Sequence, residues 1–369
     1  MSISVVHYGS LAAATGGPAY STYLSMKGVE PFGISSKIIM PPLKAGEPLI
    51  ANDVPVSYAH GSAMKQTLAE CNADLFHIQG VWMLDAHKVA SFARHHSIPY
   101  IIALRGMLYP QALQIKPLKK RIAMLLYQSE DLRKAACVQA TCPEELEHFR
   151  KLGFRTPVAI IPNAVDLSDM PAPQQKKDSV FRVGYLGRID PRKRIERILY
   201  ALASETMKGI ETECVIMGAW DSEYEAFLKK EVDRLGLRNV SFPGFLLGND
   251  KLEAIRSLSV LVVPSDFENF GNNIVEALKQ GVPCIASTGT PWQDLEQYHC
   301  GRWVPNDVPA IASAMKELAV LSPDERLAMS GNAQRLLQDK FELSVVSRKL
   351  SEMYQWIISG GTTPDFVEI

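Results

Sequence analysis

The stretch SVLVVPSDFENFGNNIVEALKQG (259–281) decides the fold, because it joins a buried strand to a helix through a loop that contains glycine. The apolar run predicts a strand that ends at Pro264, and the helix is expected to begin near Asn272 and to stop at Gly281. A continuous apolar run is typical of a strand that helices cover on both faces of a parallel sheet. The stretch therefore predicts one strand–loop–helix unit of an α/β domain.

Two carboxylates flank the start of this helix. Glu268 lies in the loop, and Glu276 follows after seven intervening residues, about one turn inside the helix. Gly271 lets the backbone approach a ligand, and the first N–H groups of a helix form a positive end that suits a pyrophosphate. Because carboxylates repel a pyrophosphate, we expect them to bind hydroxyls on either side of it, such as those of a ribose and a sugar. Alternatively, both are ordinary helix-start charges.

A strand, a basic turn and a helix are also predicted in FRVGYLGRIDPRKRIERIL (181–199). At the carboxyl end of the strand, where ligands bind in such sheets, the turn carries Arg188 and Lys193. These cations would meet the phosphates presented by Gly271–Asn273 and neutralise charge on a leaving nucleoside diphosphate. A solvated basic turn is the alternative.

The same alternation of short apolar runs and amphipathic stretches continues along the chain. Strands are predicted at 2–9, 33–40, 74–79, 99–104, 136–141, 158–163, 181–187, 213–218, 239–245, 259–265, 282–288 and 301–306. A proline-containing polar stretch at 167–178 reads as an interdomain linker. We therefore predict two doubly wound α/β domains, 1–170 and 178–345, that face a ligand cleft. The helix in the last segment, 346–369, either crosses back onto the first domain or covers the second sheet.

The composition excludes several protein classes. The chain has 369 residues, of which 47% are apolar and 21% charged, and the formal net charge is -1, so neither disorder nor a nucleic-acid partner is indicated. Six cysteines without a CxxC pair fit free thiols in a reducing, cytoplasmic compartment. No window reaches the roughly 20 apolar residues of a membrane span, and no basic region opens the chain as in a signal peptide.

Two cofactor classes are also disfavoured. No GxGxxG follows a predicted strand, which argues against a nicotinamide-dependent oxidoreductase. The chain contains no Asp-x-Asp, so a diphosphate held by a metal ion is not indicated. Gly16 and Gly17 open a helix after the first strand, where they either present N–H groups to an anion or form a plain turn.

The segments GRIDPRK (187–193), PSDFENFGNNIVEALKQGVPCIAS (264–287) and GTPW (289–292) resemble the second domain of family-4 retaining glycosyltransferases of the GT-B fold. In the first domain, IPYIIALRGMLYPQAL (98–113) and IPNAVDL (161–167) are similar to lipopolysaccharide and exopolysaccharide members of that family. The resemblance covers nearly the whole chain. It implies transfer of a sugar from a nucleoside diphosphate sugar to a hydroxyl of a growing, lipid-linked surface glycan, without a tightly bound cofactor or metal.

The resemblance also implies roles for individual residues. Glu276 would bind the ribose of the donor and Glu268 the transferred sugar, while Arg188 and Lys193 would stabilise the diphosphate. Arg105 stands where many members have histidine, and it could bind an acceptor phosphate or the sugar. The implied donor-binding residues are Gly16, Gly17, Glu268, Asn269, Phe270, Gly271, Asn272, Asn273 and Glu276; the implied catalytic residues are Glu268, Arg188 and Lys193.

Three points stay open at the level of sequence. His77 is expected to end a strand that faces the cleft, as a substrate contact or as a structural residue. The segment 114–134 combines lysines and an arginine with leucines, which fits either weak contact with an anionic membrane on its cytoplasmic face or a core helix. A nucleotide-sugar 2-epimerase and a catalytically silent glycan- or nucleotide-binding relative are the alternative functions.

Overall fold

The computed structural model describes residues 3–173 and 180–369, and residues 174–178 of the predicted linker lie outside the described residues. The chain divides into two compact units. Unit 1 consists of Met1–Asp166 and Phe341–Ile369, and unit 2 of Leu167–Lys340. The chain rejoins unit 1 at Phe341, where the backbone of Val165 forms hydrogen bonds with the Phe341 carbonyl (2.8 Å) and the Leu343 N–H (3.0 Å).

Unit 1 is built on a sheet of eight strands in the order β14-β7-β6-β5-β4-β1-β2-β3. All neighbours pair in parallel except β14, which is antiparallel to β7. The strands are β1 (Ile3–Tyr8), β2 (Ile34–Met40), β3 (Val56–Tyr58), β4 (Leu75–Gln79), β5 (Tyr100–Ala103), β6 (Cys137–Ala140), β7 (Val158–Ile160) and β14 (Val367–Glu368). Every residue of β4, β5 and β6 is buried, as expected for strands covered on both faces.

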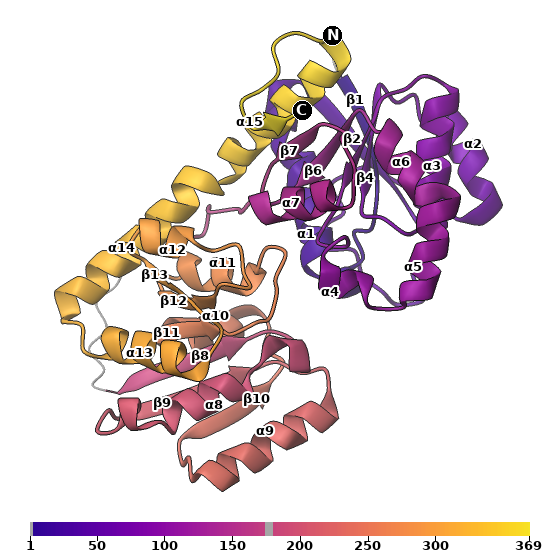
Figure 1. Ribbon diagram of the computed structural model, residues 1–369. Coiled ribbons are helices and arrows are strands. Elements are labelled where there is room, and N and C mark those ends of the chain that lie inside the picture. Colours follow the sequence, from indigo (N-terminus) through magenta and orange to yellow (C-terminus); the bar gives the residue numbers. More distant parts are fainter. Residues whose placement is uncertain (1–2, 174–179) are drawn as a thin grey trace. The chain divides into compact units, whose positions relative to one another are not determined.

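Helices cover both faces of this sheet (Figure 1). Side chains of α2, α3, α6 and α7 join one buried cluster with β4 and β6, whereas those of α1 and α15 join another with β1 and β5. The helices of unit 1 are α1 (Gly17–Gly28), α2 (Met64–Glu70), α3 (Leu84–His95), α4 (Pro110–Leu113), α5 (Pro117–Ala123), α6 (Ser129–Lys134), α7 (Pro143–Lys151) and α15 (Leu343–Ser359). A π-helical turn at Met124–Gln128 separates α5 from α6.

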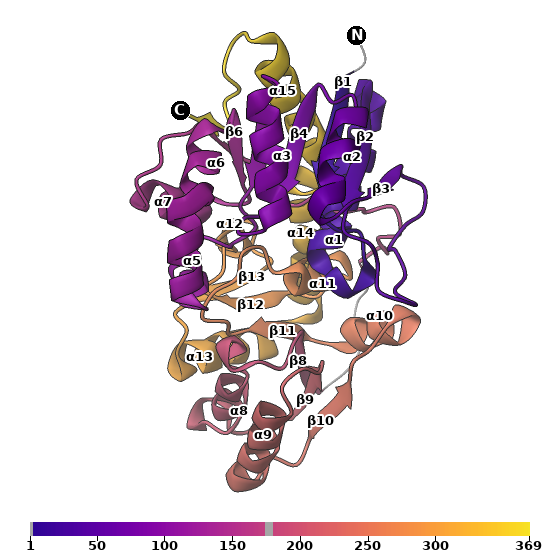
Figure 2. The same cartoon turned by 90° about the vertical axis from the view of Figure 1, so that its right-hand side faces the viewer.

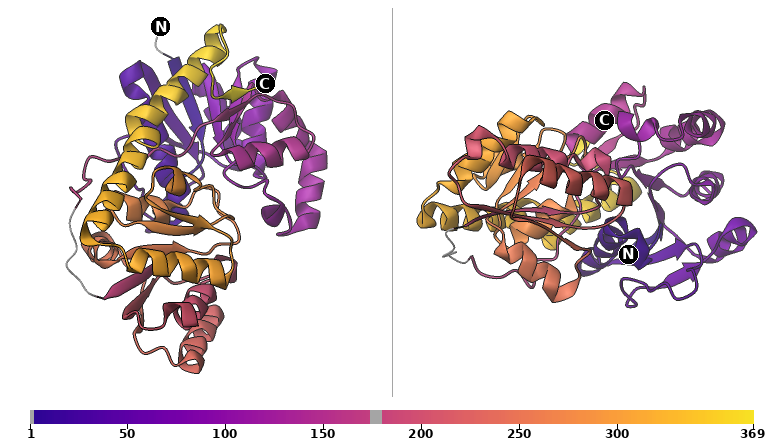
Figure 3. Two further views of the ribbon diagram at one scale, coloured as in Figure 1. Left: turned by 60° about the vertical axis from the view of Figure 1, so that its left-hand side comes forward. Right: turned by 90° about the horizontal axis from the view of Figure 1, so that it is seen from below.

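The last helix, α15, packs on the sheet of unit 1 (Figure 3). Leu350 and Tyr354 of α15 are fully buried and share a cluster with Val5 of β1 and Ile101 of β5. Trp356 packs against the same cluster. The C-terminal segment therefore covers, together with α1, one face of the first sheet.

Unit 2 contains a parallel sheet of six strands in the order β10-β9-β8-β11-β12-β13 (Figure 2). The strands are β8 (Phe181–Leu186), β9 (Thr212–Met217), β10 (Val240–Gly244), β11 (Val260–Val263), β12 (Cys284–Ser287) and β13 (Gly301–Val304). Buried side chains of α8, α9 and α13 form one cluster with β8, β9 and β11. The helices are α8 (Glu196–Leu202), α9 (Ser222–Leu235), α10 (Gly248–Ser257), α11 (Asn272–Lys279), α12 (Asp294–Gln297), α13 (Val308–Ala319) and α14 (Pro323–Lys340).

The prediction of two doubly wound α/β domains is confirmed. The twelve predicted strands all form, whereas β3 and β14 were not predicted. Both are short, and both are edge strands of the first sheet, so each pairs with a neighbour on one side only. An edge strand needs no long apolar run, and the sequence therefore shows no such run at either position. Among the described residues, the six cysteines are buried and free.

A polar cluster lies inside the apolar core of unit 1. His7 of β1 and His77 of β4 are fully buried, with ring centroids 5.2 Å apart. His77 Nδ1 lies 2.8 Å from the hydroxyl of Tyr354, which belongs to α15. Burial, with a smaller effect of Arg105, lowers the pKa of His7 to about 3, and burial also lowers the pKa of His77. Both imidazoles are therefore neutral in the folded protein.

This cluster predicts that unit 1 loses stability in mild acid. Unfolded histidine takes up a proton below its ordinary pKa of 6.5, but folded His7 does not until about pH 3, so the stabilisation is complete above pH 6.5 and declines below it. At about pH 5 the loss is about 2 kcal/mol for His7. Urea unfolding at several pH values, monitored by hydrogen exchange of the backbone amides in β1 and β4, measures this loss of stability. His7→Gln should remove this share of the loss, and the exposed His95→Gln should not; equal pH dependence of His7→Gln and wild type would contradict the assignment.

Candidate functional site

The candidate site lies at the carboxyl edge of the second sheet. The chain passes from β8 to β9 and β10 on one side and then returns to β11 on the other side of β8. The carboxyl ends of β8 and β11 therefore flank the point where the strand order reverses. In open α/β sheets, ligands bind in the crevice at this point.

Glu268 follows β11 and is held by three loops at once. Its carboxylate accepts a hydrogen bond from the ammonium group of Lys193, which follows β8, and another from Ser265 Oγ at 3.0 Å. Its backbone N–H donates to the carbonyl of Gly289, which follows β12, at 2.9 Å. Lys193 and Glu268 are thus in direct contact. Each charge compensates the other in a largely buried position.

The other cations of the basic turn are held by structural carboxylates. Arg192 donates to both carboxylate oxygens of Asp190, at 2.9 and 2.7 Å. Arg194 reaches Asp266 at 2.6 Å, and its φ of 52° is a left-handed conformation that glycine adopts without strain. These pairs leave Lys193 and Arg188 as the cations of this turn that point to the candidate site or to solvent.

Arg188 is exposed, and its guanidinium lies 5.0 Å from the ring centroid of Trp220. The backbone beside it is well anchored, because Tyr185 Oη donates to the Arg188 carbonyl at 2.7 Å. Asn273 of α11 donates from Nδ2 to the Leu186 carbonyl at 2.8 Å. The end of β8 and the start of α11 are therefore fixed to each other.

The helix α11 begins at Asn272, as predicted, after Gly271 with a φ of 82°. A Cβ atom on Gly271 would lie 3.1 Å from Trp292 Nε1, so a side chain would fit poorly there. Trp292 Nε1 donates to the carbonyl of Phe270, which holds the loop in place. Asn269 lies in the same loop. The N-terminus of α11 thus directly follows the loop that carries Glu268.

Glu276 lies on α11 and pairs with Lys251 of α10 at 3.1 Å. Its side chain is 38% exposed, so its carboxylate is accessible. Glu276 and Glu268 do not touch the same partner: Glu268 belongs to the Lys193 side and Glu276 to the Lys251 side. The two carboxylates therefore lie in separate positions, Glu268 in the loop before α11 and Glu276 within the helix.

In unit 1, Gly16 caps α1 with a φ of 68°, and the helix starts at Gly17 as predicted. Arg105 follows β5 with a φ of 53°, and its guanidinium donates to Gln79 Oε1 at 2.6 and 3.2 Å and to Asn163 Oδ1. Burial lowers the pKa of Arg105 to about 10, and nearby Glu145 opposes that effect, so the guanidinium keeps its charge at neutral pH.

The expectation that His77 ends its strand is wrong. Ile78 and Gln79 follow it within β4, and the imidazole has no exposed surface. The strand ends at Gln79, as the predicted range 74–79 has it, so Gln79 rather than His77 occupies the strand end and contacts Arg105. His77 instead lies between the sheet and α15.

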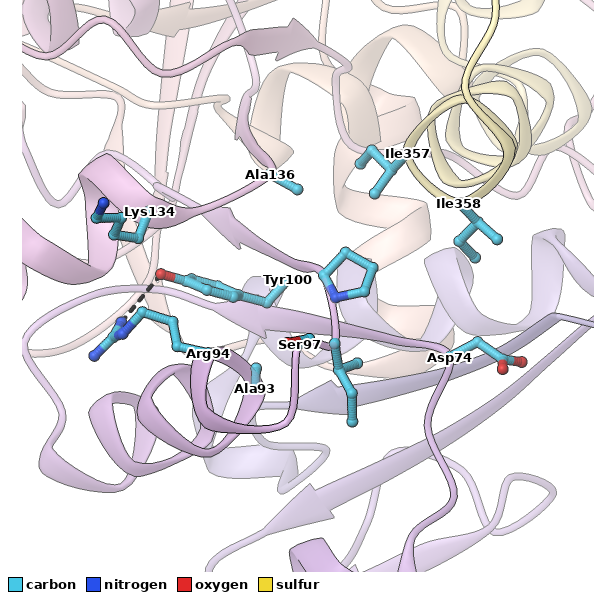
Figure 4. Close-up of a pocket in the computed structure, with 11 residues that line it drawn as sticks. Asp74, Ala93, Arg94, Ser97, Tyr100, Lys134, Ala136, Ile357 and Ile358 are labelled. Atoms are coloured by element: carbon cyan, nitrogen blue, oxygen red, sulfur yellow. Dashed lines mark hydrogen bonds between the residues drawn. The ribbon is translucent and has the colours of Figure 1, made fainter.

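A pocket of about 430 Å³ lies at the opposite, amino-terminal edge of the first sheet (Figure 4). Its wall includes Asp74, Pro99 and Ala136, which directly precede β4, β5 and β6, and Ile357 and Ile358 of α15. Since doubly wound sheets bind ligands at the carboxyl edge, we do not assign this pocket to the candidate site. In the described part of the chain, no group of three histidine, cysteine or acidic residues could hold a metal ion.

Sequence reasoning missed three residues that shape the site. Asp266 pairs with Arg194 and Arg197, Trp292 holds the α11 loop, and Trp220 stacks on Arg188. Asp266 lies in the motif 264–287 and Trp292 in the motif 289–292, so their positions in these motifs indicate that they lie near the site. Trp220 follows β9, and nothing in its local sequence indicates that its ring meets Arg188.

Two family models match the chain, one in each unit. Residues 168–336 match the glycosyl transferases group 1, and residues 41–164 match the glycosyl transferase 4-like domain. Among solved structures, HepE of Anabaena in complex with UDP and glucose aligns with a TM-score of 0.74 and 18% identity over 96% of this chain and 99% of that protein. This likeness shows the fold.

Curated relatives align over a shorter stretch. The alpha-D-kanosaminyltransferase of Streptomyces kanamyceticus is 32% identical over 177 residues, which are 47% of this chain and 45% of that protein. The phosphatidyl-myo-inositol mannosyltransferase of Mycobacterium leprae is 29% identical over 214 residues, 55% of this chain and 54% of that protein. The chain thus spans about half the length of the curated relatives it matches.

The packing of the site loops leads to a prediction about Gly218. A Cβ atom on Gly218 would lie 1.8 Å from the Gly187 carbonyl oxygen, so Gly218→Ala should force the loops after β8 and β9 apart. We expect thermal unfolding of unit 2 to show a loss of about 3 kcal/mol or more. Gly331→Ala is the matched control, because its Cβ meets open space on α14, and it should be neutral or slightly stabilising. Equal stability of the two variants would contradict the predicted clash.

Proposed function

We propose that this chain is a glycosyltransferase of the GT-B fold that moves a sugar from a nucleoside diphosphate sugar to a hydroxyl of a growing, lipid-linked surface glycan with retention at the anomeric carbon. Unit 2 is the donor domain in this proposal, and unit 1 the acceptor domain. The observation that carries it is the Lys193–Glu268 pair at the switch point of the second sheet, next to the N-terminus of α11.

The diphosphate of the donor fits the edge formed by Arg188, Lys193 and the first N–H groups of α11. These groups are positive, and they come from two adjacent elements that Asn273 ties together. We propose that they, rather than a metal ion, offset the charge that grows on the leaving diphosphate. Gly16 and Gly17 of unit 1 are proposed as further phosphate contacts.

The two carboxylates would then recognise hydroxyls. Glu276 is exposed at the rim and is proposed to accept hydrogen bonds from the ribose, with Lys251 compensating its charge. Glu268 is proposed to orient the transferred sugar. In this proposal, the contact between Glu268 and Lys193 couples the position of the sugar to that of the phosphates, because the two side chains bind different parts of the same substrate.

In the proposed reaction, the bond between the anomeric carbon and the phosphate oxygen breaks, and a bond to the acceptor oxygen forms on the same face of the sugar. The acceptor hydroxyl transfers its proton to a phosphate oxygen of the departing diphosphate. Positive charge develops on the sugar ring and negative charge on the diphosphate. Arg188 and Lys193 stabilise the latter.

The acceptor side is proposed to include Arg105, whose charge is retained and whose position is set by Gln79 and Asn163. One of the relatives is named phosphatidyl-myo-inositol mannosyltransferase, and this lipid in its name supports a lipid-linked substrate here. A donor screen with UDP and GDP sugars separates the alternatives. Transfer or slow hydrolysis supports the proposal, 2-epimerisation would identify an epimerase, and binding without reaction would identify a silent relative.

Site variants should divide by role. Arg188→Ala and Lys193→Ala are expected to lower turnover about 100-fold or more, because they remove transition-state charge stabilisation. Glu276→Ala should weaken binding of both donor and free nucleotide, whereas Glu268→Ala should chiefly lower turnover. Arg192→Ala is the matched control, since its side chain is held by Asp190. Folded variants that all keep near-wild-type turnover would refute the site.

Membrane contact is proposed for the segment 114–134. Leu118, Leu125 and Leu126 are 70%, 85% and 73% exposed, which argues against the alternative of a core helix. Lys116 and Arg121 are exposed beside them. A basic rim around apolar side chains fits the headgroups and acyl boundary of an anionic membrane, here the inner face of the cytoplasmic membrane. No helix in the described ranges is long and apolar enough to cross a bilayer.

Not all cations of this segment take part. Lys120 donates to the Ala112 carbonyl and lies 5.6 Å from the ring centroid of Trp82, so it faces the protein. Of the four cations nearest the exposed leucines (Lys116, Lys119, Lys120 and Arg121), the other three are exposed. Attachment by three charges and a few leucines should be weak and reversible.

Co-sedimentation with anionic and neutral liposomes tests this surface. Wild type should pellet with anionic liposomes at low salt and less at high salt, because salt screens the headgroup charge. Replacing Leu118, Leu125 and Leu126 by Gln should abolish pelleting, while Val320→Gln, which changes an exposed apolar residue of unit 2, should not. Absence of pelleting by wild type would reject membrane contact, and dimerisation lost in the triple variant would assign the patch to a second copy.

A further inference from the structure

The loops that follow β8 and β9 continue side by side beyond the sheet. The backbone N–H of Ile189 donates to the Ala219 carbonyl at 3.2 Å, and the N–H of Asp221 donates to the Ile189 carbonyl at 3.1 Å. Ile189 and Trp220 are thus paired in an isolated parallel bridge. Arg188 directly precedes Ile189, and Trp220 lies between Ala219 and Asp221. These backbone bonds therefore fix the positions of the two neighbouring loops that carry Arg188 and Trp220.

Trp220 is an unusual residue for such a loop. Its φ of 155° lies at the border of a region that side chains rarely adopt, and its indole is 70% exposed. Both features cost stability or solubility, and neither is compensated by burial of the ring. The side chain instead lies under the guanidinium of Arg188, 5.0 Å from centroid to Cζ.

Arg188 differs from its neighbours in the kind of partner it has. Arg192, Lys193 and Arg194 each pair with a carboxylate, whereas across residues 3–173 and 180–369 no carboxylate forms an ion pair with Arg188. A carboxylate partner would offset part of the positive charge and occupy some of the N–H donors of Arg188. An aromatic ring attracts the cation through its face and leaves the donors at the edge of the guanidinium available for an anion.

We propose that Trp220 is a positioning residue that holds Arg188 ready for the diphosphate of the donor without neutralising it. This inference rests on the proposed function, because it assigns Arg188 to the phosphates. Trp220 acts through Arg188, and it restricts a long, exposed side chain to the edge where β8 ends. The guanidinium then loses less conformational freedom when the diphosphate binds.

The test measures the affinity of inorganic pyrophosphate, UDP and GDP for four variants. Trp220→Leu keeps an apolar side chain without an aromatic face, and it should weaken binding about two- to fivefold, whereas Trp220→Phe should restore most of the affinity. Trp220→Glu should bind worse than Trp220→Leu, because its carboxylate would pair with Arg188. Phe227→Leu, which changes a partly exposed aromatic residue on α9, is the control and should match wild type.

A double-mutant cycle separates positioning from a general structural effect. In the Arg188→Ala background, Trp220→Leu should cause no further loss of affinity, because its effect passes through the guanidinium. An equal loss in both backgrounds, or equal affinities of Trp220→Leu and wild type, would overturn the inference while leaving the proposed function intact. Failure of wild type to bind pyrophosphate, UDP and GDP would overturn the proposed function and this inference together.

Discussion

The ion pair between Lys193 and Glu268 is the interaction on which the candidate site depends. It joins the turn after β8 to the loop after β11, and these are the strands that flank the reversal of strand order. The pair is mostly buried, so neither charge could stay there without the other. Ser265 and the Gly289 carbonyl hold Glu268 from the remaining directions. A substrate with phosphates and hydroxyls can engage both members of this pair.

Most of the charged side chains around this pair form ion pairs with each other. Asp190 and Asp266 take up Arg192 and Arg194, which makes the basic turn rigid, and Lys251 compensates Glu276 at the rim. A turn with many cations would repel itself if all of them were free. By neutralising most of them internally, the fold directs its remaining positive potential to one edge of the sheet.

Unit 1 also separates neutral from charged polar side chains. The fully buried histidines contribute to the junction between the sheet and α15, where Tyr354 meets His77. Arg105 lies one strand further on, in a left-handed conformation, with its charge retained between two amide side chains. The neutral side chains of His7, His77 and Tyr354 lie in the interior, whereas the charged Arg105 follows the end of β5.

The sequence by itself determined both doubly wound sheets, the start of α11 at Asn272 and the two carboxylates beside it, because apolar periodicity and glycine positions are local signals. Only the tertiary structure decided which cations pair inward, that His77 belongs to the interior, and that Trp220 lies under Arg188. These outcomes depend on which strand ends become neighbours and on how far each strand extends. Such contacts join residues far apart in the chain, and local sequence patterns carry no information about them.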